Sequence, residues 1–277
     1  MVGVYFKGRL GNQLFQYAYL LYLKSKYKDK VFFFPNPHHA YITKYFDLGT
    51  YHNLTLGSKL YSIMMRCIPR ILPFKDVFFH NFVAPKEKKP ENFTIHHGYF
   101  QSDWYLKQIE GGLKLPLKEK YIRSFHEAYG ELFSKHKTLV VHIRRTDFLS
   151  YGKRDISLPI EYFVERLNAV NDLDSYKVIF VSDDLPYVKR FFPEKPNYIF
   201  TSNSEIIDFQ IIQNADVAII SNSTFSWWAC YLSEKKQVVY APKDWMAFNI
   251  GREHPRGIMT EKFNWCNVAV KQDSSQS

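Results

Sequence analysis

From Thr138 onward, the sequence alternates between short apolar runs and segments with helical periodicity. This alternation is typical of β-α-β units, in which parallel strands are joined by helices that cover both faces of the sheet. The apolar runs predict strands at 139–143, 178–181, 198–200, 217–220 and 238–240. The intervening segments predict a helix with Pro159 at its first position, a short helix ending at Phe192, and helices at 205–214 and 224–232.

The N-terminal part of the chain has a weaker pattern. Residues 2–6 predict a strand, residues 8–13 a tight loop, and residues 14–24 an amphipathic helix. This beginning lacks the G-x-G-x-x-G pattern, which disfavours a dinucleotide-dependent oxidoreductase. Several prolines interrupt the periodicity between 31 and 135, and the regular pattern begins only after that point. We therefore divide the chain into residues 1–135 and 136–277.

The stretch from Val140 to Asp147 places charged residues directly after a buried strand. His142, Arg144, Arg145 and Asp147 would lie at the carboxyl end of that strand, where open α/β sheets bind ligands. Because a guanidinium holds phosphate through two parallel charge-assisted hydrogen bonds, the pattern favours an enzyme that grips a phosphorylated ligand. The alternative is that both arginines only pair with surface carboxylates.

A second polar group, Ser221 to Ser226, follows another core strand and opens a helix. Hydroxyl residues there could be simple N-caps. The N–H groups and positive dipole end of a helix start also form an anion site, and a neighbouring arginine on the same sheet edge favours that interpretation. Trp227 and Trp228 are expected to pack inside, with sugar stacking as the alternative.

Acidic residues at three places in the sequence are candidate ligands. Asp208 could be an exposed or capping carboxylate of its helix. Asp183 and Asp184 follow a strand and could bind a metal or a ribose. The Asp172-Leu-Asp174 sequence matches the metal-binding DxD pattern, but it precedes a strand and would lie at the wrong end of the sheet. No His/Cys set has zinc spacing, so we expect no metal site.

The composition of the chain favours some classes of binding partner and disfavours others. The net charge is +10 and the pI about 9.3, which favours anionic ligands such as phosphates. No RNA-recognition or zinc-finger signature is present, so we expect no nucleic-acid partner. Three unpaired cysteines fit a reducing compartment. The first residues enter a strand directly, unlike a signal peptide.

Five motifs together resemble the α-1,2-fucosyltransferases, glycosyltransferase family 11, over nearly the whole chain. They are Gly8-Arg-Leu-Gly-Asn-Gln-Leu-Phe-Gln-Tyr-Ala18, Gly98-Tyr-Phe-Gln-Ser-Asp-Trp104, His142-Ile-Arg-Arg-Thr-Asp147, Val181-Ser-Asp-Asp184 and Ser221-Asn-Ser-Thr-Phe-Ser-Trp-Trp228. The resemblance implies a GT-B-like α/β fold of two Rossmann-like domains with a cleft between them. Residues 1–135 would form the acceptor side and residues 136–277 the GDP-fucose-binding domain.

The resemblance also implies roles for individual residues. Arg144 matches the arginine that holds the donor's β-phosphate, with Arg145 beside it. His142 matches a donor-contacting histidine near the nucleoside. Asp208 resembles the carboxylate that recognises guanine, which makes chemical sense because guanine presents two adjacent N–H donors.

The remaining donor-binding residues come from two loops. Ser223, Thr224 and Phe225 match a phosphate cradle of backbone and hydroxyl groups. Arg9 and Asn12 match the first-domain loop that faces the cleft in the protein O-fucosyltransferase relatives.

The implied reaction is an inverting transfer of L-fucose from GDP-fucose to the 2-hydroxyl of a galactose-containing glycan, without a metal or other cofactor. Arg144 and the 223–225 amides would stabilise the charge that develops on the β-phosphate. Asp147 is a candidate catalytic base, and the alternative is that it only orients Arg145; Asp155 and Glu161 are further candidate bases. The glutamate that one relative class carries soon after the His-x-Arg-Arg motif is absent from 148–155.

The alternatives are another GDP-sugar transferase, such as an α-1,6-fucosyltransferase, or a non-catalytic carbohydrate- or nucleotide-binding protein. Eukaryotic members of the family typically carry an N-terminal anchor, and this chain starts with its first strand. We therefore expect a bacterial, cytoplasmic enzyme acting on glycan precursors, with lipid-linked acceptors among them. The basic run from Lys24 to Lys30 could contact the inner membrane peripherally.

Overall fold

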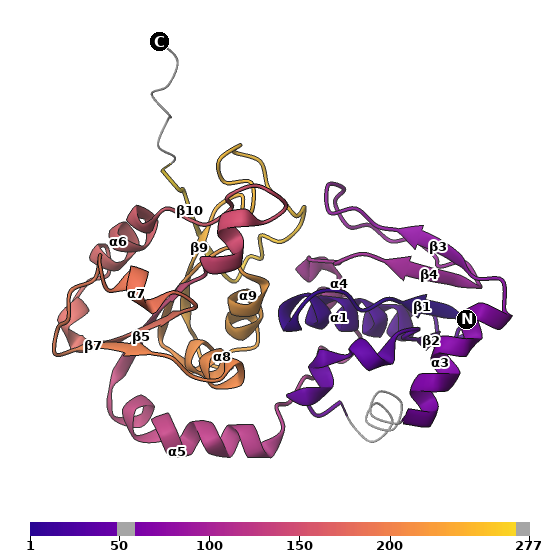
Figure 1. Ribbon diagram of the computed structural model, residues 1–277, viewed down its shortest axis with the longest axis horizontal. Helices are drawn as coiled ribbons and strands as arrows, with labels where there is room; N and C mark the ends of the chain where they lie inside the picture. The colour runs from indigo at the N-terminus through magenta and orange to yellow at the C-terminus, as the bar shows by residue number, and fades with distance from the viewer. Residues whose placement is uncertain (49–58, 270–277) are drawn as a thin grey trace, which may run out of the picture. The chain divides into compact units, whose positions relative to one another are not determined.

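The computed structural model describes residues 1–48 and 59–269, which form two compact units (Figure 1). The first unit comprises 1–121 together with 254–260, and the second comprises 122–253 together with the chain from 261 onward. The division at 135/136 inferred from the sequence falls at the end of helix α5 (Glu119–Lys135), whereas the units divide near the start of that helix.

The first unit is built on a four-stranded parallel sheet of order β2-β1-β4-β3. Its strands are β1 (Val2–Val4), β2 (Phe32–Phe33), β3 (Lys75–Phe78) and β4 (Thr94–His97). Its helices are α1 (Leu10–Lys26), α3 (Lys59–Ile71) and α4 (Asp103–Lys107), and two 3-10 turns lie at Pro37–His39 and Tyr41–Lys44.

Helix α1 differs from the expected amphipathic helix. It begins at Leu10, so only residues up to Arg9 form the predicted loop. Gly8 has φ of +79° and Arg9 is extended, which turns the chain sharply enough for the helix to start one residue later. Most of its length is buried, because the helix runs through the unit's core rather than along its surface. Its last turn carries Lys24 and Lys26.

The second unit contains a six-stranded parallel sheet of order β10-β9-β8-β5-β6-β7. Its strands are β5 (Lys137–Ile143), β6 (Tyr176–Ser182), β7 (Tyr198–Thr201), β8 (Val217–Ile220), β9 (Val238–Pro242) and β10 (Asn264–Cys266). Its helices after α5 are α6 (Ile160–Asn168), α7 (Leu185–Val188), α8 (Glu205–Asn214) and α9 (Thr224–Tyr231), with 3-10 turns at Thr146–Ser150 and Leu173–Ser175.

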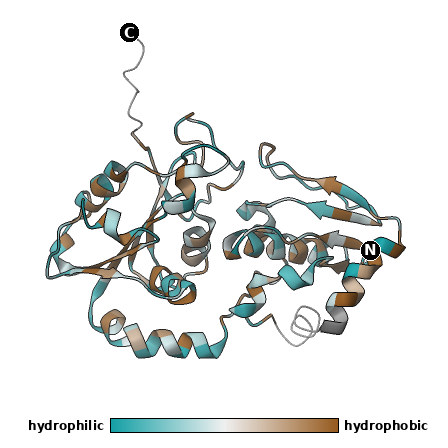
Figure 2. Ribbon diagram, in the orientation of Figure 1, coloured by the Kyte–Doolittle hydropathy of each residue, from teal (hydrophilic) through white to brown (hydrophobic). Residues whose placement is uncertain are grey.

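The parallel sheet predicted from the alternation is confirmed. Residues of β5 such as Leu139, Val140 and Val141 are fully buried, as expected for a strand covered on both faces. Figure 2 shows hydrophobic colour along the strands of this sheet, whereas α5 is banded hydrophilic and hydrophobic. Pro159 is the N-cap of α6 rather than its first residue, because its ψ of 142° is extended. Helix α5 and strand β10 were not predicted.

Candidate functional site

The polar groups predicted from the sequence meet at the carboxyl edge of the second sheet. His142 pairs in register with Ile220 of β8 on one side and with Val181 of β6 on the other. The three strands therefore end together, and Arg144, Asp183 and Ser221 follow them. Strand β5 is also where the order reverses, with β6 and β7 on one side and β8, β9 and β10 on the other. Such a switch point is where doubly wound sheets bind their ligands.

Arg144 is held by carboxylates of this edge. Its Nε and Nη2 both lie 2.8 Å from Oδ1 of Asp147, and its Nε lies 3.4 Å from Oδ2 of Asp183. The side chain is 22% exposed, so the ion pairs are only partly screened by water. The carboxylate of Asp147 thus contacts Arg144, and not Arg145 as one of the two interpretations of the sequence had it.

Arg145 is fixed by a different pair of contacts. Its Nη1 lies 3.2 Å from Oδ2 of Asp184, and its guanidinium carbon lies 3.8 Å from the ring centroid of Tyr187. Its backbone N–H donates to Oδ1 of Asp183 at 2.9 Å. Both arginines therefore form ion pairs, as the alternative interpretation expected, but their partners belong to the same sheet edge and hold the guanidiniums at it.

Asp183 and Asp184 bind groups of the protein itself. Asp183 accepts hydrogen bonds from the backbone and hydroxyl of Thr146, and Asp184 caps α7 by accepting from the N–H of Tyr187 at 3.1 Å. Among the described residues, no three His, Cys, Asp or Glu side chains gather as a metal site would require. The Asp172-Leu-Asp174 sequence precedes β6 at the amino end of the sheet, as expected.

His142 is a buried, neutral imidazole. Its Nδ1 lies 3.1 Å from Oγ of Ser221, and its ring centroid lies 6.0 Å from that of Phe225. Burial lowers the pKa of His142 to about 3, with the charge of Arg144 acting in the same direction and that of Asp183 opposing it. The ring can therefore donate one hydrogen bond and accept another across the physiological pH range, but it carries no charge there.

The helix start after β8 has the geometry of an anion site. Ser223 is the N-cap of α9 with extended backbone, and its side chain makes no capping hydrogen bond. The N–H groups of a helix's first turn have no acceptors within the helix, and they face whatever lies before it. Trp227 and Trp228 are fully buried, so the expectation that they pack inside is correct.

Asp208 is half-buried in the first turn of α8, and the exposed-carboxylate interpretation is wrong. Burial raises the pKa of Asp208 to about 6, against the hydrogen bond that Asn203 donates to its Oδ1 at 3.0 Å, while the charge of Glu205 adds to the rise. The next residue, Phe209, contacts the ring of Phe225 edge-on at 5.4 Å, which connects this carboxylate with the start of α9.

Sequence reasoning missed the residues that orient Asp208. Asn203 precedes α8, and the hydroxyl of Tyr129, from α5, donates to its Oδ1 at 3.0 Å. The same hydroxyl lies 2.8 Å from Oγ1 of Thr201, at the end of β7. No pattern in the sequence connects positions 129, 201 and 203; only the placement of α5 beside the end of β7 does.

The other candidate bases have less to do with this edge. Asp155 is exposed, and its Oδ1 accepts hydrogen bonds from the backbone and hydroxyl of Ser157 at 2.8 and 2.6 Å. Glu161 is exposed in the first turn of α6. Asp147 is the candidate in direct contact with Arg144.

Arg9 and Asn12 belong to the first unit, after strand β1. Arg9 is the exposed N-cap of α1, and Asn12 accepts a hydrogen bond at 2.8 Å from Nε2 of Gln101, a residue of the Gly98–Trp104 motif. The two motifs that the sequence analysis noted separately in residues 1–135 are therefore joined through their amide side chains.

Two glutamines of the same N-terminal motif hold its loop together. Gln16 accepts from the N–H of Lys7 at 3.0 Å and donates to the carbonyls of Lys7 and Gly98. Gln13 accepts from the N–H of Tyr41 at 2.6 Å and donates to the carbonyl of His39 at 2.7 Å. Both are buried, so these amides act as structural links that propensity reasoning gave no reason to expect.

Comparison with known proteins decides the family. The chain matches Glycosyl transferase family 11 over residues 1–268. It belongs to that family. An O-antigen biosynthesis glycosyltransferase, WbnK, from Escherichia coli is 28% identical over 87% of this chain and 94% of its own length. An alpha-1,2-colitosyltransferase from the same organism is 25% identical over 86% of this chain and 90% of its own.

Solved structures support the fold. Fucosyltransferase NodZ from Bradyrhizobium superposes with a TM-score of 0.52 at 13% identity, covering 82% of this chain and 91% of its own. A structure of NodZ alpha-1,6-fucosyltransferase co-crystallised with GDP gives the same TM-score at 14% identity, covering 83% and 92%. This family 11 member is therefore a glycosyltransferase with the GT-B type of α/β fold, as the resemblance implied.

Proposed function

We propose that this glycosyltransferase transfers L-fucose from GDP-fucose to the 2-hydroxyl of a galactose-containing glycan, with inversion and without a metal ion. The observation that carries the proposal is that Arg144 and the start of α9 follow two adjacent strands, β5 and β8, at the switch point of the second sheet. A guanidinium and a helix N-terminus on adjacent strand ends make a site for a diphosphate.

The donor would be bound by the second unit. Asp208 would accept the two adjacent N–H groups of guanine, and neutral His142 would contact the nucleoside. Arg144, with Arg145 beside it, would hold the β-phosphate. On the other side of it would be the cradle formed by Ser223, Thr224 and Phe225. The first unit would bind the acceptor, and its Arg9 and Asn12 are proposed as further donor-binding residues.

The pairing of Arg144 with Asp147 is compatible with phosphate binding. Asp147 uses the edge formed by Nε and Nη2, and Nη1 makes no hydrogen bond to any residue that the structure describes. A guanidinium offers five donors in a plane, so one edge can stay with the carboxylate while Nη1 reaches a phosphate oxygen. Asp147 then fixes the arginine before the donor arrives, which reduces the reorganisation needed during reaction.

The chemical step follows from this arrangement. The bond between fucose C1 and the β-phosphate oxygen breaks, and the electron pair stays on GDP. Arg144 and the first-turn N–H groups of α9 stabilise the growing negative charge. The acceptor's 2-hydroxyl attacks C1 from the opposite face and gives its proton to a base. Asp147 is proposed as a residue of the catalytic centre that acts through Arg144.

The relatives define the competing outcomes. One is an alpha-1,2-colitosyltransferase, which suggests a different donor sugar with the same linkage. NodZ is an alpha-1,6-fucosyltransferase, which suggests the other linkage. A non-catalytic nucleotide- or carbohydrate-binding protein is the third alternative.

The proposal is tested by incubating the purified protein with GDP-fucose or GDP-colitose and a set of terminal β-galactosides, and by determining the product linkage by NMR. We expect α-1,2-fucosylated galactosides, formed at the same rate in excess EDTA. An α-1,6 product, transfer restricted to GDP-colitose, or activity abolished by EDTA and restored by Mn²⁺ would contradict it. Nucleotide binding without transfer or donor hydrolysis would indicate the binding protein.

No helix in the described residues is long and apolar enough to cross a membrane. We propose action in the cytoplasm, with lipid-linked glycans among the acceptors and peripheral contact with the inner membrane. The run from Lys24 to Lys30 would contribute weakly, because Lys26 pairs with Glu87 and Lys28 pairs with Glu110. Vesicle flotation should show binding to anionic lipid at low salt that is lost at high salt.

A further inference from the structure

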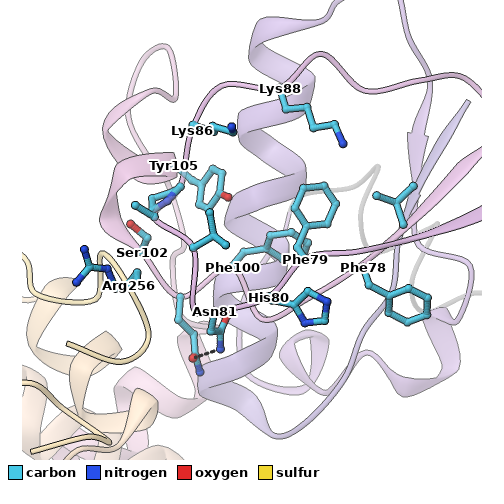
Figure 3. A pocket seen from close by; sticks show the side chains of 15 residues that line it. Phe78, Phe79, His80, Asn81, Lys86, Lys88, Phe100, Ser102, Tyr105 and Arg256 are labelled. Atoms are coloured by element: carbon cyan, nitrogen blue, oxygen red, sulfur yellow. Dashed lines mark hydrogen bonds between the residues drawn. The ribbon is translucent and has the colours of Figure 1, made fainter. Parts of the chain in front are cut away.

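The first unit contains a cavity of about 240 Å³ between β3, the loop that follows it, and the Gly98–Trp104 motif (Figure 3). This volume is below the roughly 300–1,000 Å³ of pockets that enclose drug-sized ligands, so the cavity suits one compact group such as a substituted sugar ring. Neither the donor-binding residues nor the family motifs named above explain it, although Phe100, Gln101 and Ser102 of the motif line it.

The cavity has an aromatic wall, one ring of which stacks on a residue of α1. Phe79, Phe100 and Tyr105 line it. Phe100 stacks at 3.7 Å between ring centroids on Tyr19 of α1, and its φ of +52° lies in the left-handed region that bulky residues rarely adopt. Such backbone strain tends to occur at binding sites, where the surrounding structure enforces it. An aromatic wall offers an apolar surface for the C–H face of a sugar ring.

Polar groups on the cavity connect it to the N-terminal motif. Asn81 donates at 3.0 Å to Oε1 of Gln101, and Gln101 donates from Nε2 to Asn12. Asn12 lies in the first turn of α1. The cavity is therefore two hydrogen bonds away from a residue that the proposed function assigns to donor binding, which favours an acceptor glycan as its ligand.

The charged side chains that line the cavity are all positive. Lys86, Lys88 and Arg256 line it, and its lining includes no Asp or Glu. Among the residues that the structure describes, no carboxylate pairs with any of these three cations, unlike Lys26 and Lys28, which have glutamate partners. Three unneutralised cations beside an aromatic wall attract an anionic ligand.

The segment that carries Arg256 is closely fitted to the cavity. The backbone N–H of Arg256 donates to the carbonyl of Asn81 at 2.9 Å. Gly257 has φ of +88°, and a Cβ added there would lie 2.6 Å from Oγ of Ser102 and 3.1 Å from Cδ of Pro85. Only glycine allows this approach, so Arg256 is positioned by contact with the cavity's own wall.

We propose that this cavity binds the acceptor glycan next to its galactose and selects a residue that carries an anionic group, a phosphate ester or a carboxylate. The proposal rests on the proposed fucosyl transfer for calling the glycan an acceptor, but the binding itself does not depend on it. Phe79 and Phe100 contact the sugar ring, and Lys86, Lys88 and Arg256 neutralise the anionic substituent.

The test measures binding by calorimetry without donor, using three probes that share a terminal β-galactose: neutral lactose, lactose 1-phosphate and galactosyl-β-1,4-glucuronate, whose second residue keeps its ring. We expect the wild-type protein to prefer lactose 1-phosphate over lactose by about tenfold or more, with the preference falling as NaCl is raised. If the glucuronate is bound as tightly as the phosphate, a carboxylate also satisfies the site; if it binds like lactose, the site is selective for phosphate. Equal affinity of the wild type for all three would overturn the proposal.

Variants of the lining cations test whether the preference for anionic probes arises in this cavity. The double variant Lys86→Gln/Lys88→Gln and the single variant Arg256→Gln should each lose most of the preference for the anionic probes, with unchanged melting temperature. Lys89→Gln, an exposed lysine of the same loop outside the lining, is the matched control and should keep the preference. A preference that survives both lining variants would place the anion elsewhere and reject this site. Gly257→Ala should reduce the preference by displacing Arg256.

The same samples separate this proposal from the proposed function. Binding preference without any fucosyl transfer would leave the anion site standing and reject the transferase assignment. Fucosyl transfer to lactose and lactose 1-phosphate with equal KM, together with equal affinities, would do the reverse.

Discussion

In the second unit the polar side chains that follow β5 and β6 contact one another, and Ser221, after β8, contacts His142 of β5. In the first unit the polar side chains that follow β1 hold loops instead. Arg144 and Asp183 meet directly after adjacent strands. Gln13 and Gln16 instead bind backbone groups far along the chain, such as the carbonyls of His39 and Gly98. Similar-looking motifs thus have different roles, and strand register distinguishes them.

In the sites proposed above, the two units would bind anions in different ways. The second unit uses a sheet edge with arginines already paired to carboxylates, a design suited to a defined diphosphate. The first unit uses unpaired cations beside aromatic rings, a design suited to a variable glycan.

Replacing Arg144 should have the largest effect on catalysis. Arg144→Ala should lower kcat/KM roughly 30- to 1,000-fold. This corresponds to about 2–4 kcal/mol of lost transition-state stabilisation, because a charge-assisted contact to the developing phosphate charge is lost. Arg144→Lys should recover only part of it, since an ammonium lacks the planar fork. Arg123→Ala, an exposed arginine on α5, is the control. Wild-type kinetics in folded Arg144→Ala would remove the phosphate clamp from the second unit.

A glutamine of the first unit should affect stability instead. Gln16→Leu leaves the backbone groups of Lys7 and the carbonyl of Gly98 without their partner, which should lower the free energy of unfolding by about 2–4 kcal/mol. Urea denaturation measures this, with exposed Gln108→Leu as control. If Gln16→Leu keeps its stability and loses donor binding, the contrast between the two units is wrong.

Asp208 should give GDP binding a pH dependence. The pKa of this carboxyl is about 6 in the ligand-free protein, and in the proposed site guanine would bind its ionised form. GDP affinity should therefore fall as the pH drops through about 6, and Asp208→Asn should weaken binding by about 1–3 kcal/mol and remove that dependence. Calorimetry with GDP and ADP checks both. An unchanged GDP-over-ADP preference in Asp208→Asn would exclude a role in base recognition.

The same carboxyl has an opposite effect on stability. Because its pKa is raised above the usual value of 3.8, the folded protein retains a proton that the unfolded chain has released between about pH 4 and 6. This group's contribution to stability is therefore lost as the pH rises through that interval. Comparing urea midpoints of wild type and Asp208→Asn at pH 4.5 and 7 should show a smaller difference between pH values in the variant.

Asp147 should give the smallest effect if it acts through Arg144. Asp147→Asn keeps one acceptor for the guanidinium and should lower kcat by about tenfold, with the pH profile of kcat unchanged. A general base would instead contribute roughly 10²–10⁴-fold, and its loss would abolish the acidic limb of the profile. That outcome would assign proton removal to Asp147 and leave Arg144 to be oriented by Asp183 alone.

Much of the second unit could be predicted from local sequence. Helix α8 and strand β8 have the predicted bounds, because strands buried on both faces leave uninterrupted apolar runs that polar residues separate from the neighbouring segments. The rule that ligands bind at the carboxyl edge of such a sheet then sufficed to predict that Arg144 and Ser221 lie at the same edge. In the first unit, the short strands and the deeply buried α1 blur both periods, and the helix began four residues earlier than predicted.

The sequence by itself determined the parallel α/β architecture, the strand ends that carry the arginines and hydroxyl residues, and the family, because those depend on local patterns and ordered motifs. Tertiary structure alone decided that Asp147 pairs with Arg144, that Asn203 and Tyr129 orient Asp208, and that Arg256 joins Lys86 and Lys88 around one cavity. These contacts join positions up to 170 residues apart. Which distant side chains meet is set by strand order and loop paths, and no local propensity encodes either.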